Sequence, residues 1–68
     1  MNKKTMTLNL SSDEMTVLDE LATQKGVNKT VILKQALRLY QAIQIRMQNG
    51  EKVFVEDKKN EKSELILL

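Results

Sequence analysis

The chain has 68 residues and a formal net charge of +2, and it contains neither cysteine nor histidine. A domain this short buries only about 60% of the surface that its unfolded chain exposes, so disulfides, a metal or association usually supplement its core. The missing residue types exclude disulfides, Cys or His catalysis and the common zinc, haem and iron–sulfur sites. We therefore expect an oligomer that is not an enzyme and that needs no cofactor or metal.

Hydropathy gives no sign of a membrane segment or of export. The longest uninterrupted apolar run is Leu65–Leu68, far short of the ~20 residues that cross a bilayer. The first ten residues contain no apolar core of the kind that a secretory signal requires. We expect a cytoplasmic protein without membrane contact.

Basic and acidic residues are segregated along the chain. Lys3 and Lys4 stand near the start, acids predominate over residues 11–26, and residues 27–50 hold four basic residues and no acid. If the two basic stretches lie on one face, that face suits a polyanion. Charge alone leaves open the alternative of solvated helix faces without a partner.

Residues 5–10 alternate strictly between polar and apolar side chains. This period of two is typical of a strand with one buried face. The buried face would carry Met6, Leu8 and Leu10. The solvent-facing side would carry Thr5, Thr7 and Asn9.

Two helices are predicted next. Ser11 followed three residues later by Glu14 forms a capping box, and Gly26 suits a left-handed helix end, which gives a first helix over 12–25. Asn28 is a suitable N-cap for a second helix from Lys29 to about residue 49. The second helix carries an apolar stripe wider than one short helix can cover, which predicts burial against a second copy of the chain. That stripe comprises Ile32, Ala36, Leu39, Tyr40, Ile43 and Met47, widened by Val31, Leu33, Leu37 and Ile45.

The last part of the chain is predicted to form a β-hairpin. Residues 51–56 and 63–68 have strand-like composition, and the polar residues 57–62 between them are typical of a turn. We therefore divide the chain into a domain over 1–50 and a C-terminal extension over 51–68. Because the extension is apolar on both faces, it would pack on the dimer core, pair with another subunit or bind a partner protein.

The N-terminal strand has no strand partner within the first 50 residues, so we expect it to pair with its copy in a twofold dimer. The resulting antiparallel ribbon would present Thr5, Thr7 and Asn9 twice, beside Lys3 and Lys4. A two-stranded ribbon fits the major groove of B-DNA, which is ~12 Å wide, and Thr and Asn side chains can bond base edges there.

The start of the second helix is a candidate phosphate site. The first turn of a helix offers backbone N–H groups and a partial positive charge. Lys29 adds a full charge and Thr30 a hydroxyl donor, next to the capping Asn28. A solvated first turn is the alternative for Lys29 and Thr30.

This layout resembles the ribbon-helix-helix transcriptional regulators of the MetJ/Arc/CopG type. The resemblance covers roughly residues 3–48: the alternating strand, the Ser-Ser-Asp-Glu helix start, the turn from Gly26 to Thr30 and the long second helix. It implies a mainly α fold with a short N-terminal strand, built as an intertwined homodimer with an intermolecular two-stranded antiparallel ribbon. It also implies base reading by Thr5, Thr7 and Asn9 and phosphate binding by Asn28, Lys29 and Thr30. Members of the family often have Arg or Lys among the base-reading residues of the strand, whereas these residues are neutral here. The affinity for DNA is therefore expected to depend more on Lys3, Lys4 and Lys29.

The expected function is sequence-specific binding of double-stranded DNA by a homodimer, as a repressor or autoregulator of transcription, with higher-order assembly on DNA left open. The alternative, by analogy with regulators of this layout, is an antitoxin whose C-terminal extension binds a toxin protein. The dimer core is expected to contain Met6, Leu8, Leu10, Leu18, Leu21, Ile32, Ala36, Leu37 and Tyr40.

Overall fold

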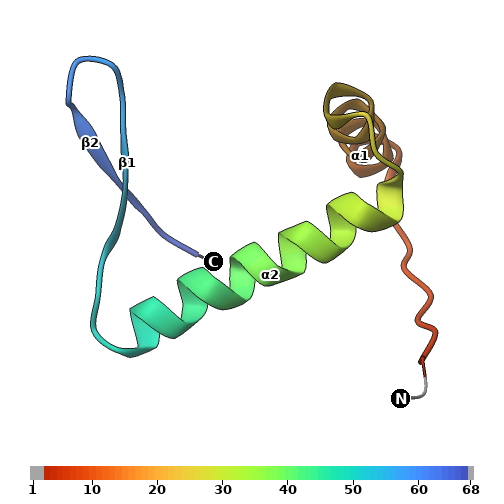
Figure 1. Ribbon diagram of the computed structural model, residues 1–68, viewed down its shortest axis with the longest axis horizontal. Helices are drawn as coiled ribbons and strands as arrows, with labels where there is room; N and C mark the ends of the chain where they lie inside the picture. The colour runs from red at the N-terminus through yellow and green to blue at the C-terminus, as the bar shows by residue number, and fades with distance from the viewer. Residues whose placement is uncertain (1–2, 68) are drawn as a thin grey trace. The chain divides into compact units, whose positions relative to one another are not determined.

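The computed structural model describes residues 3–67. Its elements are the helices α1 (Ser12–Lys25) and α2 (Lys29–Gln48) and the strands β1 (Val53–Glu56) and β2 (Lys62–Leu65) (Figure 1). The chain is thus helix-rich, with one two-stranded antiparallel sheet. Within the described residues, neither helix combines the length and apolar character of a membrane-spanning segment.

Both helices agree with the sequence prediction to within a residue. The predicted hairpin is confirmed with shorter strands, because pairing begins at Val53 opposite Leu65 and ends at Glu56 opposite Lys62. Residues 1 and 2 of the predicted N-terminal domain, and Leu68 of the predicted last strand, lie outside the described residues.

The predicted N-terminal strand is absent from the single chain, where residues 3–10 form neither helix nor strand. A strand is defined by its hydrogen bonds to a neighbour, and residues 3–10 make no backbone hydrogen bond to another described residue. Pairing with a second chain therefore stays a prediction.

Helix α1 begins at a complete capping box. The Oγ of Ser11 accepts a hydrogen bond from the Glu14 backbone N–H at 3.1 Å, and Glu14 Oε1 accepts one from the Ser11 backbone N–H at 2.9 Å. The Ser11 backbone N–H, and after it the Ser11 side chain, hydrogen-bonds the Glu14 carboxylate and lowers the pKa of Glu14. Since the folded-state pKa is the lower one, the stabilisation is complete above the unfolded-state pKa and is lost as the pH falls through the folded-state pKa.

Removal of this cap should destabilise the protein measurably. We expect Ser11→Ala to lower the free energy of unfolding by about 1 kcal/mol at neutral pH, because the Glu14 N–H loses its acceptor. Ser12→Ala is the control, since the Thr16 hydroxyl donates its hydrogen bond to the backbone carbonyl of Ser12 and not to the Ser12 side chain. Urea unfolding at one protein concentration compares the two, and equal losses would contradict the capping role of Ser11.

The connection between the helices is a tight turn. Gly26 adopts a left-handed conformation with φ of +66°, and its N–H reaches the carbonyls of Ala22 and Thr23. The Val27 N–H bonds the Ala22 carbonyl at 3.1 Å, and Asn28 Oδ1 then accepts the Val31 N–H at 3.0 Å to start α2. The predicted end of α1 and the predicted N-cap of α2 are both confirmed.

The chain divides into two units, with the boundary after Leu33 inside α2. In the first unit the buried residues are Leu18, Ala22 and Ile32, and the half-buried Leu10 and Val27 pack against them. This core is very small for a folded domain. Other residues of the predicted dimer core are exposed in the single chain: Met6, Leu8, Leu21, Ala36, Leu37 and Tyr40.

In the second unit, α2 ends before Gly50, which has a φ of +83°. The hairpin turn is held by Asp57, whose Oδ1 accepts from the backbone N–H groups of Lys59 at 2.8 Å and Glu61 at 3.0 Å. Asn60 takes the left-handed position with φ of 65°, a conformation that asparagine tolerates better than most residues. Residues 57–61 therefore form the predicted turn, whereas Lys62, which was predicted to belong to it, is the first residue of β2.

Candidate nucleic-acid interface

The first candidate surface is the N-terminal segment, residues 3–10. Its backbone N–H and C=O groups make no hydrogen bond to any other described residue. All the predicted base readers and both flanking lysines are exposed on it: Lys3, Lys4, Thr5, Thr7 and Asn9. Two of the three apolar members of the alternation are also in solvent, with Met6 at 82% and Leu8 at 50% exposure. The segment thus has an unpaired backbone and an uncovered apolar set.

The segment is fixed at its C-terminal end. Leu10 is half-buried against the small core, and Ser11 directly after it is held by the capping box. Its last apolar residue therefore packs against the small core of the first unit, whereas Met6 and Leu8 do not.

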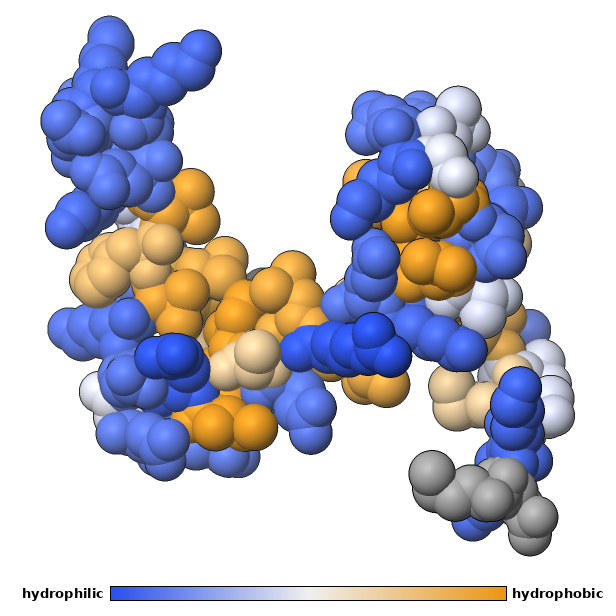
Figure 2. Space-filling view, viewed as in Figure 1, coloured by the Kyte–Doolittle hydropathy of each residue, from blue (hydrophilic) through white to orange (hydrophobic). Residues whose placement is uncertain are grey.

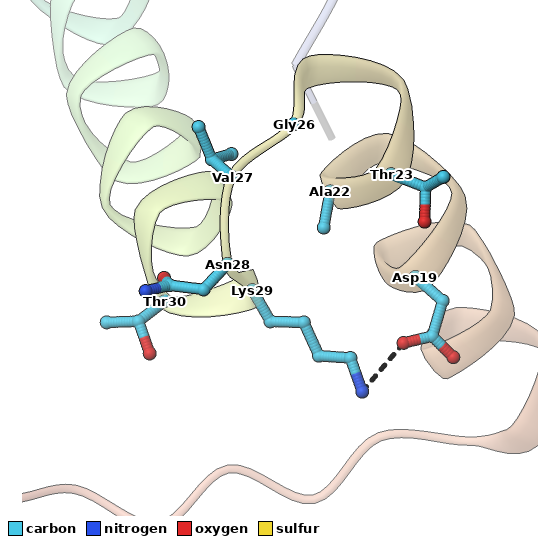
Figure 3. A pocket seen from close by; sticks show the side chains of 8 residues that line it. All are labelled: Asp19, Ala22, Thr23, Gly26, Val27, Asn28, Lys29 and Thr30. Atoms are coloured by element: carbon cyan, nitrogen blue, oxygen red, sulfur yellow. Dashed lines mark ion pairs between the residues drawn. The ribbon is translucent and has the colours of Figure 1, made fainter.

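The second candidate surface is an open pocket where α1 meets α2 (Figure 3). The three predicted phosphate-binding residues, Asn28, Lys29 and Thr30, all lie at its edge. Asn28 uses its side-chain oxygen to cap the helix, as expected. The backbone N–H groups of Lys29 and Thr30 have no acceptor among the described residues, which leaves them open to an anion.

An acidic residue that the sequence reasoning did not single out also lines this pocket. Asp19 Oδ1 lies 2.6 Å from Lys29 Nζ, and the side chains of both are about half exposed (Figure 3). Asp19 precedes Ala22 and Thr23 by three and four residues and so shares their helix face, but this spacing does not indicate Lys29 as its partner. The tight turn at Gly26 then brings the first residue of α2 back to that face.

The ion pair changes the electrostatics of the predicted phosphate site. Its Lys29 charge is compensated in the free chain, so an arriving phosphate must compete with the Asp19 carboxylate. An exposed pair of this kind contributes only about 0.2–1 kcal/mol, so the exchange is feasible.

The structure thus groups Asn28, Lys29 and Thr30 around one pocket and the five N-terminal residues on one segment. No hydrogen bond or ion pair joins the two groups within the described part of the chain. In comparisons with known proteins, no family model, no curated protein and no solved structure matches this chain.

Proposed function

We propose that the chain is a sequence-specific DNA-binding regulator that acts as a twofold dimer and represses or autoregulates transcription. In this proposal two copies of residues 5–10 pair into an antiparallel ribbon, and Thr5, Thr7 and Asn9 read bases in the major groove. Asn28, Lys29 and Thr30 hold a phosphate on each side. The observation that carries the proposal is the exposed N-terminal segment, whose backbone hydrogen bonds to no other described residue.

The distribution of apolar surface supports the dimer. Among its described residues the first unit has only three that are buried, whereas Met6, Leu8 and Leu37 of the chain are 82%, 50% and 71% exposed. Burying each such side chain would contribute about 1.5–3 kcal/mol relative to leaving it exposed. Pairing with a second copy would bury these residues and also provide hydrogen-bond partners for the backbone groups that face the second strand.

The residues of the ribbon support DNA as the ligand. Threonine can donate and accept a hydrogen bond and pack its methyl group against thymine, and asparagine can bond an adenine edge through two hydrogen bonds. Lys3 and Lys4 lie next to these readers, and the N-terminus of α2 adds backbone donors for phosphate.

Selection from a pool of randomised duplexes tests the proposal. A twofold dimer reads the same edge pattern twice, so the enriched duplexes should share a palindromic consensus with two half-sites. Enrichment of no sequence, together with binding that depends on salt alone, would contradict sequence-specific reading.

Substitutions of Asp19 and of Lys29 are expected to change the affinity for DNA in opposite directions. Lys29→Ala should weaken binding to DNA. It should also make the negative slope of log affinity against log salt shallower by about two per dimer, one for each lost phosphate contact. Asp19→Asn should strengthen binding to specific and random DNA alike, by up to about 1 kcal/mol per site, because the competing carboxylate is gone.

Glu20→Gln is the matched control for Asp19→Asn, since it removes the same charge from the neighbouring exposed position. Titrations of each variant with one duplex at several salt concentrations measure both effects. If Asp19→Asn and Glu20→Gln raise the affinity equally, the gain is general electrostatics and Asp19 does not compete for Lys29.

A further inference from the structure

The hairpin has a free strand edge. Of the described elements, only β2 contacts β1, so the opposite side of β1 carries unpaired backbone groups. Its side chains are also in solvent, with Phe54 at 52% and Val55 at 59% exposure. Figure 2 shows the turn of the hairpin as hydrophilic. An apolar, unpaired edge is the kind that pairs with another strand.

The hydrogen bonds of the turn determine which residues face that edge. The Asp57 N–H donates to the Glu61 carbonyl at 2.9 Å, so these two residues form a hydrogen-bonded pair. Hydrogen-bonded and non-hydrogen-bonded pairs alternate along an antiparallel ladder. Val55 and Val53 therefore bond β2, whereas the N–H and C=O groups of Phe54 and Glu56 are directed to the free edge.

We propose that β1 pairs antiparallel with β1 of a second copy of this chain, with the twofold axis at Phe54. Phe54 then lies opposite its own copy, Val53 opposite Val55 of the second copy, and Lys52 opposite Glu56 of the second copy. Every pair is complementary: aromatic with aromatic, β-branched with β-branched, and cation with anion. Each such cross-strand pair is stabilising in a sheet.

The sequence disfavours other registers. A shift by one residue would place outward-directed backbone groups opposite inward-directed ones, so the ladder could not form. A shift by two would place Phe54 opposite Glu56, or Lys52 opposite Phe54, and break the match. The ladder ends where Glu51 would meet Asp57, and both carboxylates are engaged in their own chain, with Arg46 at 3.4 Å and with the turn backbone.

The four-stranded sheet formed in this way has two distinct faces. One face gathers Val53, Val55 and Leu65 from each copy, since Val53 already pairs with Leu65. On the other face, Glu56 lies between Lys62 of its own hairpin and Lys52 of the second copy. The edge of β2 offers no equivalent, because Lys62–Leu65 contains one apolar residue. The pairing is a second self-association surface, in the second unit of the chain, and it holds whether or not the protein binds DNA.

Cysteine cross-linking of the full-length protein tests the pairing, and the absence of natural cysteine makes each introduced thiol a unique reporter. Across a hydrogen-bonded pair the Cα atoms lie about 5.5 Å apart, within the range of a disulfide. Phe54→Cys should therefore give a covalent dimer in a glutathione redox buffer. Val55→Cys is the matched control, because its two copies would be offset by two residues, or about 8 Å, which is too far.

A double variant that retains Phe54 makes the test independent of that side chain. Lys52→Cys with Glu56→Cys should form the covalent dimer, whereas each single variant should not. Within one chain these two positions are about 13 Å apart along the strand and cannot bridge.

The proposal predicts at least about fivefold more covalent dimer for Phe54→Cys and for the double variant than for their controls, because only these place thiols within disulfide range. Equal yields across all variants would overturn it, since random collision would explain them. A preferential cross-link of Ser63→Cys would also overturn it in favour of the β2 edge. Monomeric products throughout would likewise overturn it, because the proposed register places these thiols within disulfide range.

Discussion

Replacement of Leu37 by aspartate is expected to unfold the protein at micromolar concentration. Leu37 is 71% exposed in the single chain, so a monomeric fold would tolerate the change with little loss. In the proposed dimer the same side chain is buried, and an unpaired carboxylate there carries a desolvation cost of several kcal/mol. Because the free energy of unfolding of a small domain is about 5–15 kcal/mol, such a cost is enough to unfold it.

Arg38→Asp is the control for this variant, because Arg38 is the next residue along α2, is exposed, and changes charge by more than Leu37→Asp does. Thermal unfolding followed by circular dichroism, with sedimentation for the molecular mass, measures both variants. The wild-type melting temperature should rise with protein concentration, as it does when folding and association are coupled. A folded wild-type monomer at micromolar concentration would contradict the dimer.

Asn9→Ala is expected to impair recognition of the selected DNA sequence while barely altering binding to random DNA. Each copy loses a bidentate base contact, which should cost roughly 1–3 kcal/mol per contact on the specific site. Thr7→Ala should have the same effect to a smaller degree, because one hydroxyl discriminates between bases less than an amide does. Asn49→Ala makes the same chemical change at an exposed position after α2 and should leave both affinities unchanged.

The measurement is titration of each variant with the selected duplex and with a random duplex at one salt concentration. Equal losses on the two duplexes would make Asn9 a backbone contact instead of a base reader.

The helices could be predicted from sequence because their signals are local. The capping box of Ser11 and Glu14, the left-handed Gly26 and the N-cap Asn28 each act within four residues, and the structure contains all of them. The hairpin was predictable in kind, but its strands are shorter than the apolar run suggests. Residues after Leu65 would have to pair with Lys52 and Glu51, which belong to the connection from α2.

The N-terminal strand and the role of Asp19 were harder to predict from the sequence, for different reasons. Alternation over residues 5–10 indicates a strand but not its partner, and a single chain cannot form the pairing that defines it. The contact of Asp19 with Lys29 depends on how the turn at Gly26 joins two helices, and ten residues of sequence separate the two side chains. Periodicity within one helix contains no information about such a contact.

The central claim, that the N-terminal ribbon reads DNA sequence, is tested most directly by one ratio. The dissociation constant of the wild-type protein for the selected duplex is compared with that for a scrambled duplex of equal length and composition, and the comparison is repeated with the Thr7→Ala, Asn9→Ala double variant. The wild-type protein should favour the selected duplex by about 10³-fold or more, as specific DNA-binding proteins do, and the double variant should lose most of that preference. If the wild-type protein binds both duplexes equally, or if the double variant keeps the full preference, the ribbon is not the reading surface.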